Sequence, residues 1–368
     1  DYWAVSFAEP NVGTVVGGIY RTTDGGRTWT EQESPVPGPG FADVFFNDGD
    51  TGAVVGGFGT ILRTTDGGAT WLEQDSGTNE PLNGLSFADP DTGMVVGFNG
   101  TILGTTDGGA TWEARNSGTD AILRGVWLVD ANTATAVGES GTILRTTDGG
   151  ATWAPQDSGT ELTLKAVSFA SATTGIAVGE AGTLLRTTDG GATWIAQESG
   201  SSMPLNDVWF VDENVGTVVG GEGTILRTTD SGETWVREDT DAVVTSLMSG
   251  GDEPIRRGKT FNGVSMTDPD HGVAVGEFSG VVRRLALPDA SGGCDQWCAK
   301  SLECSPDSSE SCAVGCLCNL RYHGLISAQC EAAVAASMAC FAALSCEQIE
   351  AYFDDPDNHP CTAAEERL

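Results

Sequence analysis

The chain carries six near-copies of one nine-residue phrase, Arg-Thr-Thr-Asp-Gly-Gly-Ala-Thr-Trp with small changes. The steps between their aspartates are 42, 41, 41, 41 and 41 residues, and the aspartates are Asp24, Asp66, Asp107, Asp148, Asp189 and Asp230. A fixed period of about 40 residues, rich in short strand patterns, is typical of a β-propeller in which each repeat forms one four-stranded blade. The period therefore predicts an all-β ring.

Each repeat contains four short β-rich runs separated by Gly, Asp and Pro, as residues 82–115 illustrate. This pattern indicates four antiparallel strands joined by tight turns. The first strand of each repeat has one apolar anchor, and the anchors are Val5, Val44, Leu85, Val126, Val167, Val208 and Val264. Seven anchors predict an all-β seven-bladed β-propeller over residues 1–287.

The repeated phrase falls between the third and fourth strands, where its chemistry is local. The Asp carboxylate can accept backbone N–H groups across the turn, the glycines permit positive φ, and the Trp packs against the sheet. Since each of six repeats has them, we interpret these aspartates and Trp29, Trp71, Trp112, Trp153, Trp194 and Trp235 as structural groups rather than catalysts, metal ligands or sugar platforms. We expect no metal and no cofactor, and we interpret the acidic turn Asp89–Asp91 as ordinary turn chemistry.

The phrase matches the Asp-box, or BNR repeat. Together with the preceding Val-Gly-x-x-Gly-Thr-Ile-Leu run and the upstream Val-Ser-Phe strand, it resembles the photosystem II assembly-factor family of propellers, over residues 1 to about 287. The resemblance implies seven blades and a role in holding other proteins during assembly. Sialidases, xyloglucanases and sortilin-type receptors share the box, so it does not by itself select a function.

Charge and hydropathy exclude several classes of partner. Acidic residues outnumber basic ones 52 to 18, a formal net charge of −34, which repels nucleic acid and anionic membrane surfaces. No apolar run approaches the roughly 18 residues of a membrane span, so we expect no membrane insertion. Because the chain begins at Asp1, we also expect an N-terminus from which an export signal has been removed.

All ten cysteines fall in the last 75 residues, in a tail that also changes to a helical pattern. An even number in a short segment favours a disulfide framework over a zinc site, because the spacing does not match common zinc motifs. We therefore expect a linker at 288–293, a cysteine-rich helical domain at 294–368, and an oxidising location, whether secreted, periplasmic or at the cell surface. The pairing stays open among Cys294, Cys298, Cys304, Cys312, Cys316, Cys318, Cys330, Cys340, Cys346 and Cys361.

Because repeated positions build the scaffold, a site particular to this chain is expected where the repeats differ. An insertion between Trp235 and Val264 carries Arg256, Arg257 and Lys259. At the mouth of the central channel we expect Trp3, Arg124 and Lys165 among small polar residues. The two cations either dock an acidic group of a partner or offset nearby carboxylates. The proline-rich segment 34–40 is expected on the same face, and the last repeat lacks the box phrase.

These observations favour a non-catalytic module that holds a protein partner on the insertion-bearing face. The alternative is a carbohydrate-active protein, either a lectin or a glycoside hydrolase that binds a glycan. Asp43 and Asp207 occupy equivalent positions and would face each other across the channel, but we interpret them as strand-end caps. The repeated Arg63, Arg145, Arg186 and Arg227 are interpreted as strand-end ion-pairing groups.

Overall fold

The computed structural model describes residues 2–38, 40–238, 260–268, 271–276 and 282–284. By its contacts the chain divides into two compact units, Asp1–Ala286 and Leu287–Leu368. The second unit lies outside the described residues, and with it lie the expected helical domain and all ten cysteines. No helix among the described residues is long and apolar enough to span a membrane.

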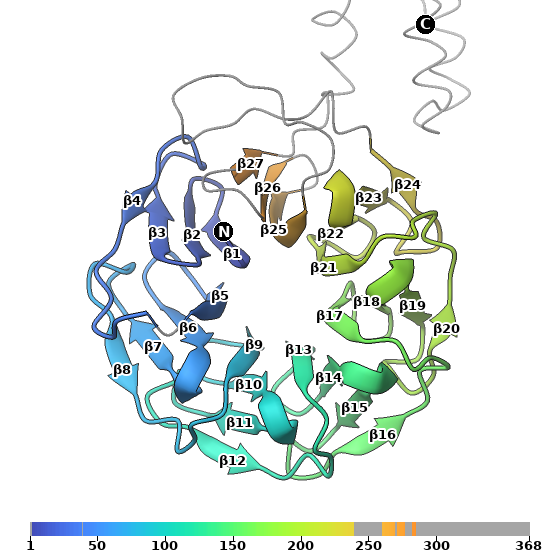
Figure 1. Cartoon of the computed structure of the whole chain (residues 1–368), viewed down its shortest axis with the longest axis horizontal. Coiled ribbons are helices and arrows are strands. Elements are labelled where there is room, and N and C mark those ends of the chain that lie inside the picture. The colour runs from blue at the N-terminus through green and yellow to red at the C-terminus, as the bar shows by residue number, and fades with distance from the viewer. Residues whose placement is uncertain (1, 39, 239–259, 269–270, 277–281, 285–368) are drawn as a thin grey trace, which may run out of the picture. The chain divides into compact units, whose positions relative to one another are not determined.

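Six antiparallel four-stranded sheets form the first six blades (Figure 1). Blades 1 to 3 consist of β1 (Ala4–Glu9), β2 (Val12–Val16), β3 (Ile19–Thr22) and β4 (Thr30–Glu31); β5 (Phe41–Phe46), β6 (Gly52–Gly56), β7 (Ile61–Thr64) and β8 (Leu72–Gln74); and β9 (Leu82–Phe87), β10 (Gly93–Gly97), β11 (Ile102–Thr105) and β12 (Glu113–Arg115).

Blades 4 to 6 repeat the arrangement. They consist of β13 (Leu123–Leu128), β14 (Ala134–Gly138), β15 (Ile143–Thr146) and β16 (Ala154–Gln156); β17 (Leu164–Phe169), β18 (Gly175–Gly179), β19 (Leu184–Thr187) and β20 (Ile195–Ala196); and β21 (Leu205–Phe210), β22 (Gly216–Gly220), β23 (Ile225–Thr228) and β24 (Val236–Arg237). Within each sheet the strands follow chain order from the channel outward. The all-β propeller is therefore confirmed, and the described residues contain no α-helix.

The seventh repeat corrects the expected count of seven blades, because within the described residues six blades are complete and the seventh is not. It forms a three-stranded sheet of β25 (Phe261–Asp268), β26 (His271–Gly276) and β27 (Val282–Arg284). The physical reason is in the sequence, because this repeat has no box phrase to turn the chain into a fourth strand. The ring still closes, since Phe7 N donates to Ser265 Oγ at 3.0 Å and Tyr2 N donates to Gly276 O at 3.2 Å.

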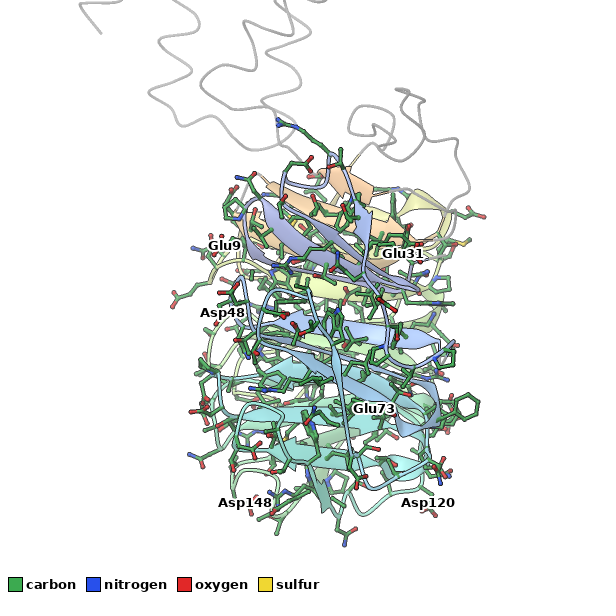
Figure 2. The ribbon with its side chains drawn as sticks, turned by 90° about the vertical axis from the view of Figure 1, so that its left-hand side faces the viewer. Glu9, Glu31, Asp48, Glu73, Asp120 and Asp148 are labelled. Carbon is green, nitrogen blue, oxygen red and sulfur yellow. The ribbon has the colours of Figure 1, made fainter. Side chains whose placement is uncertain are left out.

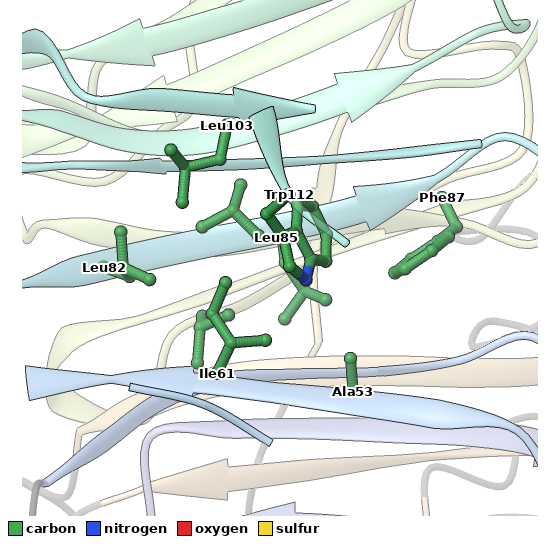
Figure 3. Close-up of a cluster of buried hydrophobic side chains, with 9 residues drawn as sticks. Ala53, Ile61, Leu82, Leu85, Phe87, Leu103 and Trp112 are labelled. Atoms are coloured by element: carbon green, nitrogen blue, oxygen red, sulfur yellow. The ribbon is translucent and has the colours of Figure 1, made fainter. Parts of the chain in front are cut away.

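The hydrophobic core is divided among the seams between neighbouring blades. Between blades 2 and 3, Ala53 and Ile61 meet Leu85, Phe87 and Trp112, as Figure 3 shows. Comparable clusters occupy the other seams. Burying each large side chain of this kind contributes about 1.5–3 kcal/mol, so blade-to-blade packing carries much of the fold's stability.

The connections between strands separate into two faces of the ring. On the first, which we call the box face, the Asp-box turns meet the turns between first and second strands, as where Gly25 N donates to Asn11 O at 3.0 Å. The opposite face, the mouth face, carries the turns between second and third strands and the connections between blades. These turns include η1 (Gly57–Gly59), η2 (Phe98–Gly100), η3 (Glu139–Gly141), η4 (Glu180–Gly182) and η5 (Gly221–Gly223).

Figure 2 shows the ring from its side, with Glu9, Asp48 and Asp148 along the box face and Asp120 on the mouth face.

Candidate functional site at the mouth of the central channel

Both carboxylate oxygens of each of the six box aspartates accept hydrogen bonds from their own turn. Asp107 Oδ1 accepts the Thr105 hydroxyl at 2.8 Å and Thr111 N at 2.9 Å, and its Oδ2 accepts the Thr111 hydroxyl at 2.6 Å. These bonds, led by the one from the Thr111 hydroxyl, lower the pKa of Asp107 to about 2. The same network recurs in the other boxes. Such carboxylates are engaged in holding turns.

The box tryptophans pack against their own sheets. In five blades the ring meets a first-strand Phe edge to face, as in the Phe87–Trp112 pair, whose ring centroids are 6.1 Å apart. Trp71, Trp112 and Trp194 are buried. A buried ring cannot stack on a sugar, so these tryptophans offer no glycan platform.

The strand arginines differ from their predicted role as ion-pairing groups. Arg63 Nε donates to Gly108 O and Arg145 Nε donates to Gly190 O, both at 2.6 Å. Arg186 Nε likewise donates to Ser231 O at 3.1 Å. Each acceptor is a backbone carbonyl in the box turn of the next blade, so these arginines clamp neighbouring blades together. Arg227 does form an ion pair, with its Nε 4.0 Å from Glu238 Oε1.

The first strands of the blades enclose a cavity of about 150 Å³ in the central channel. The predicted residues Trp3, Arg124 and Lys165 all line it. The asparagines expected beside them have another task, because Asn83, Asn206 and Asn262 donate to the carbonyls of Leu123, Phe261 and Tyr2 in the following blade. The polar ring is therefore partly a set of blade-to-blade bonds, which leaves the aromatic and the two cations as the distinctive groups.

Arg124 is held between a carboxylate and an aromatic ring. Its guanidinium donates to Glu139 Oε1 at 2.5 Å and lies 5.8 Å from the centroid of the Phe98 ring. Both partners belong to turns of the mouth face. About a third of the side chain stays exposed, so the cation is oriented and remains accessible.

Lys165 lies one blade further around the channel. Its ammonium donates to Asn206 Oδ1 at 2.8 Å. Burial lowers the pKa of Lys165, Arg124 lowers it further, and Glu180 opposes both effects. Arg124 and Lys165 line the same cavity, and Trp3, 52% exposed, lines it with them.

Asp43 and Asp207 also line this cavity, partly buried. Asp43 accepts Val44 N and Leu85 N, each at 2.8 Å, and Asp207 accepts Val208 N and Val264 N in the same way. Each carboxylate thus caps its own strand and also bonds to the next blade. Burial raises the pKa of each to about 7, and the charge of Asp43 further raises that of Asp207.

Toward the box face the channel is lined by aromatic rings. Trp127 and Trp209 pack edge to face with centroids 5.6 Å apart, although they belong to blades 4 and 6. The small Ser168 occupies the intervening position in blade 5. The cavity therefore combines cations at the mouth, carboxylates below them and indole rings beyond.

The other predicted site residues lie outside the described part of the chain. Arg256, Arg257 and Lys259 fall within 239–259, and their role as partner-binding cations stays a prediction. Within the described ranges, no cluster of three or more His, Cys, Asp or Glu side chains could hold a metal ion.

Sequence reasoning missed a second, larger cavity of about 520 Å³ beside blade 1. The sequence does contain a feature that points to this cavity, because the first repeat has fewer residues than the others between its second and third strands.

Comparisons with known proteins agree with this architecture. The sequence profile of the family described as "Photosynthesis system II assembly factor YCF48" matches residues 73–154, 116–204 and 154–237. No curated protein sequence gives a significant match.

Among solved structures, the chain is similar to "YCF48 bound to D1 peptide", with 22% identity, a TM-score of 0.61, and coverage of 78% of this chain and 91% of that one. YCF48 from Cyanidioschyzon merolae has 21% identity and a TM-score of 0.59, over 77% and 95% of the two chains.

The GH74 xyloglucanase from Xanthomonas campestris has 16% identity and a TM-score of 0.60, over 78% of this chain and 52% of that one. At these identities the structural likenesses show the fold alone, while the profile matches add a likeness in sequence. The chain is thus a BNR-type propeller that resembles the photosystem II assembly factor.

Proposed function

We propose that this protein is a non-catalytic binding module that holds a segment of a partner protein over the channel mouth. The observation that carries the proposal is the convergence of Trp3, Arg124 and Lys165 on one cavity. Exposed Trp and Arg side chains are the types most enriched among residues that dominate binding energy. The solved complex of a similar propeller with a peptide supports the same use of the fold.

The chemistry of the mouth favours a partner segment with an acidic group beside an apolar one. Lys165 and Arg124 offer charge-assisted donors to a carboxylate, and Trp3 offers an exposed apolar surface. Because most of the chain's charge is negative, the two cations would orient such a segment rather than simply attract it.

The test is photo-crosslinking in the native host with a reactive amino acid at position 3, compared with one at position 27. Arg27 is an exposed residue of a box turn, on the opposite face. A partner captured only from position 3 would then be titrated against Trp3→Ala, Lys165→Ala and the control Arg27→Ala. We expect the first two to weaken binding on the order of tenfold. Equal binding by all three variants would refute the proposal.

A carbohydrate-active function is the second candidate, and the channel carboxylates favour it. Asp43 and Asp207 line one cavity, as the two carboxylates of a glycosidase do, and burial raises the pKa of each to about 7. The likeness to a xyloglucanase fold points the same way. Hydrolysis of xyloglucan by the purified chain, abolished by Asp207→Asn, would establish this function. Glycan binding without hydrolysis would indicate a lectin.

We also propose that the protein works in an oxidising compartment, as a secreted, periplasmic or cell-surface protein. The support is the concentration of all ten cysteines in the last 75 residues. Mass spectrometry of the unreduced protein from its host tests this. Disulfide-linked peptides are expected, and free thiols throughout would contradict the proposal.

A further inference from the structure

Equivalent residues of the seven first strands form layers along the central channel, because these strands share one register with their second strands. The anchors Val44 and Val208, for example, pair with Val54 and Val218. The residue before an anchor and the residue after it lie on the same face of the strand, about 6–7 Å apart along it. The residues before the anchors form what we call the carboxylate layer, and the residues after the anchors form the ring layer.

The carboxylate layer has a small residue in five blades and an aspartate in the other two. The small residues are Ala4, Gly84, Gly125, Ala166 and Gly263. In three of these blades the next blade leaves no room for a side chain, since a Cβ atom on Gly84, Gly125 or Gly263 would lie 3.0 Å or less from its backbone. Blades 2 and 6 instead hold Asp43 and Asp207 at this position. The two aspartates are therefore particular to these blades and are not part of the repeat.

The two carboxylates belong to β5 and β21, which lie on opposite sides of the channel (Figure 1). Burial raises the pKa of Asp207, and the charge of Asp43 raises it further, so the two groups interact across the channel. Each carboxylate oxygen accepts one backbone N–H and keeps a second acceptor position. None of the ion pairs among the described residues involves either aspartate. A positive group between them would relieve their mutual repulsion.

The ring layer alternates between aromatic residues and serines around the channel. Its members, from blade 1 to blade 7, are Ser6, Phe45, Ser86, Trp127, Ser168, Trp209 and Ser265. The serines bond to the next blade, as where Ser168 Oγ accepts Phe210 N at 3.3 Å. The small Ser168 also leaves room for the rings of Trp127 and Trp209 to meet across it. The alternation therefore brings three aromatic rings to the cavity, which all three line.

Carboxylates and aromatic rings at one cavity match an ammonium group. Carboxylates attract its charge, and so do ring faces within about 6 Å, a distance close to the spacing of the two layers. The cavity measures about 150 Å³, and a cavity of roughly this volume can hold a molecule the size of benzene, so a methylated ammonium fits. A calcium ion would instead take six or more oxygen ligands, which aromatic rings do not supply.

The cations of the mouth lie one position further along the strands than the carboxylate layer, and each has an acidic neighbour. Arg124 pairs with Glu139. Burial lowers the pKa of Lys165, and Glu180 opposes this effect. A molecule that carries an ammonium beside a carboxylate therefore matches both levels of the cavity, with its negative group at Arg124 and Lys165.

We propose that the central cavity binds an ammonium group between the carboxylates of Asp43 and Asp207, against the aromatic side chains of the ring layer. The ammonium belongs either to a small free amine or to a Lys side chain of a partner segment at the mouth. The carboxylates hold a charge and transfer no proton, which separates this role from glycoside hydrolysis. The inference does not rest on the proposed function, because a free amine tests it without a partner.

The first experiment titrates the full chain, with isotopically labelled tryptophan, with tetramethylammonium chloride and follows the indole signals by NMR. We expect shifts at Trp127 and Trp209, and none at the box residues Trp112 and Trp194. A parallel titration with sodium chloride controls for ionic strength. tert-Butanol, a neutral molecule of similar size, should shift none of the four. Absence of shifts at Trp127 and Trp209, or equal shifts with tert-butanol, would overturn the proposal.

Variants separate the two layers. Asp207→Asn removes one charge and should weaken tetramethylammonium binding roughly tenfold. Glu222→Gln is its matched control, because Glu222 is exposed in η5 of the same blade and does not line the cavity; it should leave binding unchanged. Trp209→Leu should weaken binding roughly fivefold, with Trp127 as the reporter. Equal effects of Asp207→Asn and Glu222→Gln would contradict the assignment.

The pH dependence of binding is a measurement that the wild-type protein provides. Burial raises the pKa of Asp43 and of Asp207 to about 7, so both ionise as the pH rises from about 5 to about 8, whereas tetramethylammonium keeps its charge throughout. Binding should therefore tighten at least tenfold, on the order of one pKa unit of interaction. The variant Lys165→Met should show the same dependence. Binding that does not change with pH would refute the role of the two aspartates.

Two peptides distinguish the sources of the ammonium. Ac-Gly-Lys-Glu-Gly-NH2 presents an ammonium beside a carboxylate, and Ac-Gly-Gln-Glu-Gly-NH2 lacks only the ammonium. Tighter binding of the Lys peptide than of tetramethylammonium would assign the cavity to a partner's Lys side chain, and the reverse order would assign it to a free amine. Equal binding of the two peptides, together with no binding of tetramethylammonium, would contradict the proposal while leaving partner capture at position 3 as a separate question.

Discussion

The box face and the mouth face of the ring are built from the same repeats, yet they differ in how uniform they are. On the box face, the Asp Oδ2 to Thr hydroxyl distance is 2.6 or 2.7 Å in all six boxes. On the mouth face, one turn position has φ between 50° and 57° in five blades but a different side chain in each, namely Phe58, Asn99, Ser140, Ala181 and Glu222.

The difference shows that side-chain identity is constrained on the box face, whereas backbone conformation is constrained at the variable turn position of the mouth face. The box face repeats side chains because those side chains make the turn. On the mouth face this turn position repeats only its backbone conformation, because the turn is held there by backbone bonds such as Thr101 N to Phe98 O. Side chains there are free to differ between blades, and binding sites are disproportionately found on such positions.

The largest expected effect concerns the two channel carboxylates, Asp43 and Asp207, whose ionisation makes the free energy of unfolding depend on pH. Asp43 and Asp207 have pKa values raised to about 7 by burial. A raised pKa means that folding favours the protonated form, so this contribution is present below about pH 4 and is lost as pH rises through about 7. Between pH 5 and pH 8 we expect each carboxylate to lower the free energy of unfolding by roughly 2–3 kcal/mol, measured by denaturant unfolding at each pH.

The control is the double variant Asp43→Asn with Asp207→Asn. It is expected to be less stable overall, because an amide cannot accept both backbone N–H bonds through two oxygens. Its stability should nevertheless depend less on pH than that of the wild type. An unchanged pH dependence would show that the two carboxylates titrate near their ordinary values.

The next prediction compares the cost in unfolding free energy of a Thr→Val substitution on the box face with that of one on the mouth face. The buried Thr187 hydroxyl accepts Gly191 N at 2.9 Å and donates to Asp189 Oδ1 at 2.8 Å. Thr187→Val leaves a buried donor without a partner, at a cost of about 2 kcal/mol. Thr183→Val, in the mouth-face turn of the same blade, removes one exposed bond to Glu180 O and should cost less than half as much. Equal losses of unfolding free energy would contradict the separation of the faces.

A smaller effect is expected at the seams between blades. Arg145→Met removes the bond to Gly190 O in the next blade while keeping most of the side chain's packing, and should cost about 1 kcal/mol. Blade 3 provides the natural comparison, because Gly104 occupies the equivalent position and Arg115 lies beside it. Gly104→Met should therefore change the free energy of unfolding for a different reason. The new side chain would crowd Arg115, and no bond between blades would be removed.

The sequence predicted the strands, the box turns and the two faces because these depend on residues close together in the chain. Asp107, Thr105 and Thr111 lie within seven residues of one another, and their bonds follow from turn chemistry. The bond from Arg63 Nε to Gly108 O and the bond from Leu85 N to Asp43 Oδ2 join residues more than 40 positions apart. Their partners depend on how neighbouring blades are offset, which no local pattern specifies.

The cavity of about 520 Å³ beside blade 1 lies between these two cases. The shortened turn at Gly17 and Gly18 is visible when repeats are aligned, and so are the prolines of 34–40. An alignment of the repeats does not show that the turn between the second and third strands packs directly against the connection to the next blade. The close approach of Gly59 to the Thr78 carbonyl shows this packing in blade 2. The sequence alone therefore does not predict that a shorter turn in blade 1 leaves a cavity; the packing of the other blades is needed for that inference.

The smallest expected effect is a gain in stability on the mouth face. Phe58 has a φ of 57° and is 77% exposed, so it combines an unfavourable backbone conformation with an exposed apolar ring. Phe58→Asn should raise the free energy of unfolding by about 0.5 kcal/mol, because Asn tolerates the left-handed region better.

Asn99 occupies the equivalent turn of blade 3 with a φ of 50°, so Asn99→Phe is the matched reverse change and should cost a similar amount. If Phe58→Asn stabilises the protein but weakens partner binding, the ring at position 58 is retained for recognition at the expense of stability, as the contrast between the two faces predicts. A loss of stability on Phe58→Asn would instead place Phe58 among the structural groups and narrow the variable part of the mouth face to the remaining blades.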